Sequence, residues 1–302
     1  MKFVLTFLLF LITAQADRNV SYTFHFNIEK APRTDRVEFT AVVPQSMDKR
    51  QTVEVDFSLK PSRIYIDKGV KYAHWSLTNV KSGVHFTMKV KGQLKTYELD
   101  SLKKGSFKLP AAEKTKYLNP EKYLESASPD IVDLARKIKD GKTTVETAEN
   151  ILQEVCKIMK YEGWIEKDNG ALKSLKLKTG DCTDYSDLFI ALCRAKKIPA
   201  RFMSGVVSFW RAGDTPKHNR AEFYVESLGW VPVDPLWTDL KNASLKKVGD
   251  NYLIFSTRRN DPNLGGYAFW YYRYWGKPVK VAASIEIHSD SKQKKLPAKT
   301  GY

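Results

Sequence analysis

Residues 180–207 read GDCTDYSDLFIALCRAKKIPARFMSGVV, and the interpretation of the whole chain depends on this stretch. A glycine and a cysteine between two aspartates precede an apolar run, which is typical of the beginning of a helix. Apolar side chains then recur at helical spacing on one face: Tyr185, Leu188, Phe189, Leu192 and Cys193. The tripeptide Ile-Pro-Ala at 198–200 ends this helix, and residues 201–210 favour a strand. The stretch therefore predicts a helix, with a cysteine at its start, followed by a strand.

Cys182 occupies a different kind of position from the other two cysteines of the chain. Cys156 and Cys193 each fall in an apolar helical stripe, so both are predicted to be core residues. Cys182 and Cys193 are separated by a rise of ~16 Å along the predicted helix. The two Cα atoms of a disulfide must lie within ~7 Å of each other, so these cysteines cannot pair while the helix is intact. At a helix start, free N–H groups and the helix dipole stabilise a thiolate, the nucleophilic form of cysteine. Cys182 is therefore a candidate nucleophile, although Asp181 and Asp184 oppose its ionisation and make a nearby imidazolium necessary.

A nucleophilic cysteine needs a base, and that base is itself oriented by a third group. Among the five histidines, His218 is the one in a stretch that can fold beside Cys182. Residues 221–225 and 230–233 predict a β-hairpin, in which His218 begins one arm and Asp234 ends the other. A carboxylate beside an imidazole fixes its tautomer and stabilises its charged form. We therefore expect a catalytic triad of these three residues.

Residues 180–207 and the stretch HNRAEFYVESLGWVPVDP at 218–235 resemble the core of the transglutaminase-like superfamily, which is similar in architecture to papain-like cysteine proteases. The shared pattern is a Gly-x-Cys at a helix start, Leu-Phe, Arg-Ala, Ile-Pro-Ala-Arg, a histidine that opens a strand, and Trp-x-x-x-Asp-Pro. In this sequence the pattern falls on Gly180, Cys182, Leu188, Phe189, Arg194, Ala195, Ile198, Pro199, Ala200, Arg201, His218, Trp230, Asp234 and Pro235. The resemblance covers about residues 118–240.

The resemblance implies that Cys182 is the nucleophile, His218 the general base and acid, and Asp234 the orienting group. Attack on a carboxamide or peptide carbonyl would give a thioester, which water would hydrolyse and an amine would convert by transamidation. The backbone N–H of Cys182 is one candidate donor to the oxyanion. Tyr161 or Trp164 is a second candidate, with core packing as the preferred role of both side chains.

Arg220 departs from the family pattern, because many members carry an aromatic residue two positions after the histidine. A positive charge here is expected to make the pocket beside the base more polar and to favour an acidic substrate group. It also leaves open a domain that kept its fold and lost its activity.

The segment before this core has the alternating period of half-buried strands. The pattern occurs in four runs, at 22–28, 37–43, 53–59 and 84–90. Short strands at this spacing predict an antiparallel β-sandwich at about residues 18–95, and a β-rich N-terminal domain is similar to that of many exported bacterial members of the superfamily. Three histidines of this region are each isolated from any other ligand or base, so we expect them to have surface or packing roles: His25, His74 and His85.

The predicted fold class is therefore α+β, with an N-terminal antiparallel β-sandwich domain at 17–110. A transglutaminase- or papain-like core of helices packed on an antiparallel sheet follows at 111–288. Two helices of this core are expected from the caps at Ser128-Pro129 and Thr143. The aromatic run GYAFWYYRYW at 266–275 is expected to pack as a strand, with a substrate platform as the alternative.

Both ends of the chain are expected to lie outside the fold. Residues 1–16, MKFVLTFLLFLITAQA, have the charged start, apolar run and small-x-small end of a cleavable signal peptide. The run is shorter than the ~20 residues of a spanning helix, so we expect a secreted or periplasmic protein that is not transmembrane after cleavage. Residues 289–302 are polar and predict a tail.

The formal charge of +16 becomes +15 when Lys2 is removed with the signal peptide. Such a charge favours anionic partners, but the lysines are spread along the chain, which favours a charged soluble surface. We expect a protein or peptide substrate, an anionic envelope component as an optional second partner, no specific nucleic acid, and no metal or other cofactor. The preferred function is hydrolysis of peptide or amide bonds; the alternatives are a true protein-glutamine transglutaminase and a non-catalytic envelope-binding scaffold.

Overall fold

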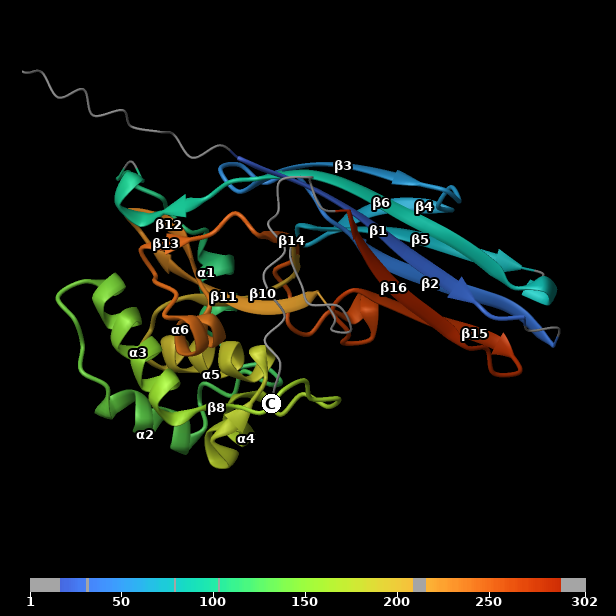
Figure 1. Cartoon of the computed structure of the whole chain (residues 1–302). Coiled ribbons are helices and arrows are strands. Elements are labelled where there is room, and N and C mark those ends of the chain that lie inside the picture. The colour runs from blue at the N-terminus through green and yellow to red at the C-terminus, as the bar shows by residue number, and fades with distance from the viewer. Residues whose placement is uncertain (1–16, 31–32, 79, 103, 209–215, 289–302) are drawn as a thin grey trace, which may run out of the picture.

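The computed structural model describes residues 17–30, 33–78, 80–102, 104–208 and 216–288. The predicted signal peptide and the predicted polar tail both lie outside these residues. Figure 1 shows helices gathered around one sheet, and beside them two layers of long strands. The mixed α+β class predicted from the sequence is confirmed, with the N-terminal strands preceding the helical core.

The long strands form a sandwich of two four-stranded antiparallel sheets. One sheet has the order β16-β1-β6-β3, with bounds Val281–His288, Arg18–Ile28, Val84–Leu94 and Gln51–Phe57. The other has the order β15-β2-β5-β4, with bounds Trp270–Gly276, Thr34–Val43, Val70–Thr78 and Arg63–Asp67. The alternation noted in the sequence turns one side of β1 inward, where Phe26 packs against Phe39 and Phe86.

The last two strands return to the beginning of the chain. Ile285 of β16 lies opposite Phe24, and Tyr272 of β15 lies opposite Phe39. The sequence-based division placed both strands within 111–288, but this pairing makes them part of the sandwich, next to β1 and β2 in Figure 1. The aromatic run packs as expected of a strand, with the Trp270 ring stacked 5.7 Å from that of Phe39.

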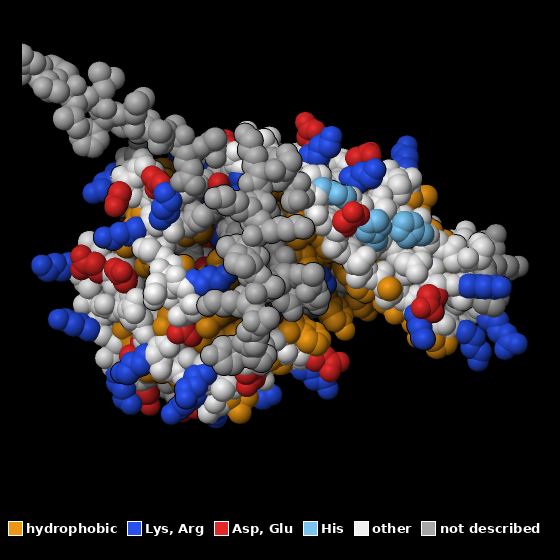
Figure 2. Space-filling view, viewed as in Figure 1, with side chains coloured by type: hydrophobic (Ala, Val, Ile, Leu, Met, Phe, Trp, Pro, Cys, Tyr) orange, Lys and Arg blue, Asp and Glu red, His pale blue; other side chains and the backbone are white. Residues whose placement is uncertain are grey.

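The sandwich histidines have the neighbours that the sequence did not reveal. The rings of His25 and His85 stack 5.7 Å apart, and Nε2 of His25 lies 3.4 Å from Oε2 of Glu286. His74 contacts the carboxylate of Glu38. Histidine side chains gather on the sandwich face in Figure 2, because cross-strand pairing brings together residues that are far apart in the chain. The expectation that each is isolated was wrong.

The core sheet has the order β12-β11-β10-β14, with bounds Gly229–Val233, Lys217–Val225, Ala200–Val207 and Tyr252–Ser256. Six helices accompany it in the described chain, and their bounds are Ala111–Leu118 (α1), Pro129–Lys137 (α2), Thr144–Ile158 (α3), Gly170–Leu177 (α4), Cys182–Ala195 (α5) and Pro235–Lys241 (α6). Short 3₁₀ turns span Val80–Ser82, Leu99–Ser101 and Pro262–Leu264. Two short pairs complete the elements: β7 (Tyr97–Glu98) with β13 (Lys247–Val248), and β8 (Lys160–Tyr161) with β9 (Thr179–Gly180).

Helix α5 is the centre of the core, since every side chain from Thr183 to Arg194 is buried. Cys193 lies fully inside, and Cys156 of α3 is partly buried against the same cluster. Burial raises the pKa of the Cys156 thiol to about 12 and also raises the pKa of Cys193. The predicted packing role of both cysteines is confirmed.

The core sheet also closes one end of the sandwich. Val206, Leu253 and Phe255 from β10 and β14 join the apolar core of the sandwich. The buried amide of Gln51 binds both backbone groups of Ile254, accepting from its N–H at 2.7 Å and donating to its carbonyl at 2.9 Å. Within the described part of the chain, no helix is long and apolar enough to cross a membrane.

Candidate active site

The first turn of α5 explains the two aspartates around Cys182. Asp181 is the N-cap, and its carboxylate accepts from the N–H groups of Thr183 at 2.7 Å and Asp184 at 3.4 Å. Asp184 completes a capping box by accepting from the Asp181 N–H at 3.2 Å. Both aspartates therefore define where the helix begins, and Cys182 is its first residue.

Gly180 is required by the same turn. A Cβ at this position would lie 2.5 Å from Cβ and 2.8 Å from Oδ2 of Asp184, closer than real side chains allow. The absence of a side chain at Gly180 therefore allows the close approach of the capping box. Burial and the neighbouring Asp181 charge raise the pKa of Asp184, and bonds from backbone N–H groups oppose that rise.

His218 and Asp234 meet at the open end of the β11–β12 hairpin, as the hairpin prediction requires. Nε2 of His218 lies 2.6 Å from Oδ2 of Asp234, and the two residues are 2% and 5% exposed. The second carboxylate oxygen of Asp234 accepts from the Trp237 N–H at 3.1 Å, which makes Asp234 the N-cap of α6. Since each oxygen has its own partner, the carboxylate cannot turn away from the imidazole without losing a helix cap.

Cys182 lies close enough to His218 for the two side chains to interact. Burial by itself lowers the pKa of His218, but the charge and hydrogen bond of Asp234 and the contact with Cys182 outweigh burial and raise it to about 10. The imidazole is therefore protonated at neutral pH. The structure thus brings together all three residues named from the sequence.

Aromatic rings hold the imidazole in place, and sequence reasoning missed them. The Trp237 ring stacks on His218 at 4.7 Å with an interplanar angle of 16°, and Tyr252 meets it edge-on at 6.0 Å. The Tyr252 hydroxyl donates to the His218 carbonyl at 3.0 Å. Only the proximity of Trp237 to Asp234 in the sequence was a usable signal, because Tyr252 comes from a strand paired on the far side of β10.

Tyr161 and Trp164 lie in the segment that runs past the start of α5. Tyr161 pairs with Gly180 in the parallel β8–β9 bridge, and the Glu162 N–H donates to the Gly180 carbonyl at 3.3 Å. Their side chains are 46% and 74% exposed. The expectation that Tyr161 and Trp164 pack in the core was therefore wrong. Both side chains are exposed, on the segment that pairs with the residues just before Cys182.

Arg220 is buried, with 4% of its surface exposed. Its guanidinium carbon lies 3.7 Å from the centre of the Tyr252 ring, and burial lowers its pKa. The charge of Arg220 therefore lies against the Tyr252 ring. The sequence-based expectation was a positive charge that lines the substrate pocket beside His218. No group of three or more His, Cys, Asp or Glu side chains that could hold a metal ion occurs among the described residues.

Comparison with known proteins finds a family model that matches part of this chain. Residues 132–235 match the family model described as the transglutaminase-like superfamily. An uncharacterized protein of Haemophilus influenzae is 36% identical over 95 residues, and the match covers 24% of this chain and 24% of the relative. The chain therefore spans about a quarter of the length of that relative.

Two solved bacterial structures are similar to this chain. A candidate cysteine protease from Cytophaga hutchinsonii superimposes with a TM-score of 0.60 at 16% identity, over 94% of this chain and 96% of that one. The periplasmic domain of TgpA from Pseudomonas aeruginosa gives a TM-score of 0.40 at 12% identity, over 74% and 90%. The first likeness extends over both the sandwich and the core and is a likeness of fold.

Proposed function

We propose that this chain, whose residues 132–235 are a transglutaminase-like domain, is an exported cysteine enzyme that hydrolyses peptide or amide bonds through a thioester. The observation that carries the proposal is the buried His218–Asp234 pair with Cys182 beside it at the start of α5. Export rests on residues 1–16 of the sequence alone.

The raised pKa of His218 supports a charged imidazole in the resting site. A protonated imidazole beside a cysteine stabilises the thiolate, which is the attacking form. The Cys182 sulfur attacks the substrate carbonyl carbon, and the C–N bond of the tetrahedral intermediate breaks as His218 donates its proton to the leaving amine. The neutral imidazole then takes a proton from water, the hydroxide attacks the thioester, and the cysteine leaves as the thiolate beside the imidazolium. Asp234 holds the ring orientation through both steps.

We assign the oxyanion to the N-terminus of α5. The Asp181 carboxylate occupies the N–H groups of Thr183 and Asp184. The N–H of Cys182 itself is the donor closest to a carbonyl under attack by the same residue, as in other acyl-transfer sites. Trp164, 74% exposed on the neighbouring segment, is proposed as a substrate contact or second donor.

The proposed substrate is a protein or peptide, and water is the preferred acceptor because it is abundant outside the cell. A contact with an anionic envelope component is a further proposal that rests on the net charge, which is +16 for the full sequence and +15 without residues 1–16. Figure 2 shows Lys and Arg side chains mixed with Asp and Glu on one face, which favours a weak, salt-sensitive contact over a dedicated binding tail.

The direct test is Cys182→Ala assayed on a fluorogenic peptide library and with a fluorescent primary amine plus a glutamine donor. We expect turnover to fall by about a thousandfold or more, since the nucleophile and its base act as a unit. Cys156→Ala is the matched control, because it also removes one thiol and leaves the triad complete. Turnover that survives Cys182→Ala would contradict the proposal, and Cys182-dependent amine incorporation would assign transamidation in place of hydrolysis.

A further inference from the structure

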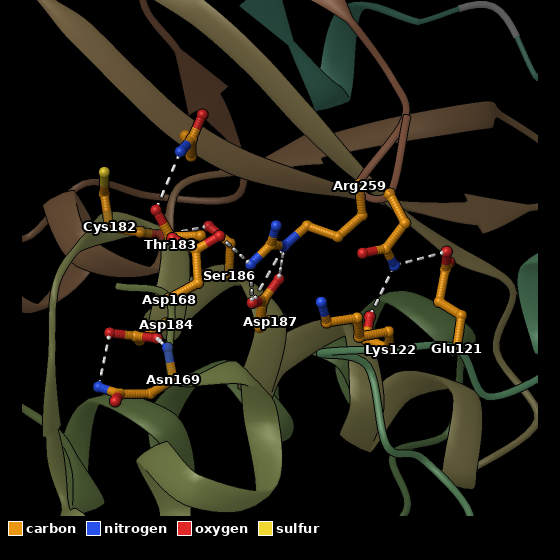
Figure 3. A network of polar contacts seen from close by, with 12 residues as sticks. Glu121, Lys122, Asp168, Asn169, Cys182, Thr183, Asp184, Ser186, Asp187 and Arg259 are labelled. Atoms are coloured by element: carbon orange, nitrogen blue, oxygen red, sulfur yellow. Dashed lines mark hydrogen bonds and ion pairs between the residues drawn. The ribbon is translucent and has the colours of Figure 1, made fainter. Parts of the chain in front are cut away.

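Three acidic side chains spaced three residues apart at the start of α5 contact other segments, and two of them, Asp184 and Asp187, are shown in Figure 3. Asp181 accepts from the Ile165 N–H at 3.3 Å. Asp184 accepts from the Asn169 N–H at 3.1 Å and from its side-chain amide at 3.3 Å. Asp187, one turn further along the helix, is fully buried and pairs with Arg259. The first two carboxylates hold residues 162–169 against the helix that begins with Cys182.

Arg259 supplies the missing third contact. Its Nε donates to Oδ1 of Asp187 at 2.9 Å and its Nη2 to Oδ2 at 2.9 Å, so the pair is bidentate. The same Nη2 donates to Oδ2 of Asp168 at 2.7 Å, which joins α5 to residues 162–169 through one guanidinium (Figure 3). Its side chain is 4% exposed and its charge lies 4.3 Å from the Tyr123 ring.

The two residues beside Arg259 point to other parts of the molecule. Nη1 of Arg258 donates to Oδ2 of Asp67 at 2.8 Å and to the Tyr72 hydroxyl at 3.1 Å, both in the sandwich. The side-chain amide of Asn260 donates to the Lys122 carbonyl at 2.7 Å. Three successive side chains therefore contact the sandwich, the nucleophile helix and the segment before α2.

We infer that residues 258–260 form a strap that ties the β-sandwich to the proposed nucleophile helix, with Arg259 as a positioning residue for the reaction of Cys182. The inference rests on the proposed function for its catalytic meaning. Arg259 acts through Asp187 and Asp168, and it touches neither substrate nor triad. Asp187 and Cys182 lie on the same helix, in which the hydroxyl of Ser186, the residue before Asp187, donates to the Cys182 carbonyl at 2.7 Å.

A buried ion pair is a poor device for stability alone, because apolar side chains of similar size often stabilise a fold equally well. Burial raises the pKa of Asp187 to about 7 against the opposing charge of Arg259, and the charges of Asp168 and Asp184 add to the rise. The carboxylates of Asp168, Asp184 and Asp187 would repel one another without a cation. Arg259 binds two of them, Asp187 and Asp168, and so fixes the contact between α5 and residues 162–169.

The test compares Arg259→Gln with Arg258→Gln in the full chain. Hydrogen exchange of residues 162–169 is followed by mass spectrometry, and the alkylation rate of Cys182 by iodoacetamide is measured from pH 5 to 10. Arg259→Gln should speed exchange of this segment by at least about tenfold and shift the pH midpoint of Cys182 alkylation. Arg258→Gln loses the sandwich end of the strap and the contact to Asp261 but keeps both aspartates bound to Arg259, so it should change both readouts less than Arg259→Gln does.

Two further variants keep the inference falsifiable if Arg259→Gln fails to fold. Arg259→Lys retains the charge without the bidentate fork and should give an intermediate shift. Asp168→Asn weakens the contact between Arg259 and residues 162–169 and leaves the Arg259–Asp187 pair complete. Since Asp168 is 35% exposed, the fold should tolerate the change. Exchange of residues 162–169 should be faster, with a smaller effect on Cys182 alkylation. Unchanged exchange and an unchanged pH midpoint in folded Arg259→Gln, with a lowered melting temperature, would reduce the strap to a structural ion pair and overturn the inference.

This test is separate from that of the proposed function. Exchange and alkylation need no substrate, so the strap can be confirmed even where Cys182→Ala shows that turnover depends on another residue. Conversely, turnover that depends on Cys182 together with unaltered exchange and alkylation in Arg259→Gln would support the proposed function and contradict the strap.

Discussion

His218 donates from Nε2 to Oδ2 of Asp234 at 2.6 Å, across the open end of a hairpin whose two arms end at these residues. The other oxygen of Asp234 caps α6. The Trp237 ring of this helix stacks on the His218 imidazole. One carboxylate therefore fixes the base, the start of a helix and, through that helix, the ring above the base.

This double role allows charge and cap to be separated by Asp234→Asn. Asparagine is as good an N-cap as aspartate, so the cap of α6 is kept and the melting temperature should fall less than in Asp234→Ala. The neutral amide cannot stabilise the imidazolium, and kcat should fall by about a hundredfold to ten-thousandfold. Asp234→Ala is the comparison: it should lose the same activity and also about 1 kcal/mol of stability. Equal activity of Asp234→Asn and the unaltered enzyme, measured on the same peptide, would remove Asp234 from the mechanism.

The raised pKa of His218 predicts how stability depends on pH. The folded value is about 10 and the ordinary value is 6.5, so the protonated folded state is favoured. The stabilisation is fully present below pH 6.5 and is lost as pH rises toward 10. Melting temperatures from pH 5 to 10 should therefore fall more steeply above pH 6.5 in the unaltered protein than in His218→Gln. Parallel curves would show that the imidazole is not held in its charged form.

Gly180→Ala should damage the start of α5. The added Cβ would meet Asp184 at 2.5 Å, so the capping box must open or shift. Overpacking of this kind costs about 1–3 kcal/mol in free energy of unfolding, measured by urea denaturation. Gly249→Ala is the matched control, because its nearest contact would be an ordinary 3.5 Å. Equal stability of the two variants would mean that the capping box of α5 does not require a glycine at position 180.

Trp164→Ala separates substrate contact from folding. A side chain that is 74% exposed should change the free energy of unfolding by no more than about 0.5 kcal/mol. If residues 162–169 form the wall of the substrate site, KM should rise severalfold while the fold is kept. Tyr267→Ala removes another exposed aromatic ring, 65% exposed, and should leave KM unchanged. Identical KM values in both variants would place the substrate elsewhere.

Local sequence patterns predicted the local parts of this structure well. The cap and stripe of α5 and the hairpin that joins His218 to Asp234 depend on neighbours within a few residues or one turn, and both are visible in the sequence. The prediction of the hairpin ends needed only the return of the chain; the 2.6 Å contact could not be read from it.

Contacts between distant segments could not be predicted from one sequence. Arg259 lies 72 residues from Asp187, and no periodicity marks their pairing. The return of β16 to β1 is of the same kind, as is the exposure of Trp164, whose apolar side chain alone suggested a core position. Such features depend on which segments meet in space, and local pattern carries no information about that.

The most direct test of the central claim is the pH dependence of iodoacetamide alkylation of the folded protein, with each modified cysteine mapped by mass spectrometry. The account predicts selective labelling of Cys182, with a pH midpoint well below the ~8.5 of a free thiol, and loss of that low midpoint in His218→Gln. Cys156 and Cys193 should stay unlabelled, because burial raises the pKa of both thiols. An unreactive Cys182, or one that titrates like an ordinary thiol with His218 intact, would contradict the assignment of this site as an active site.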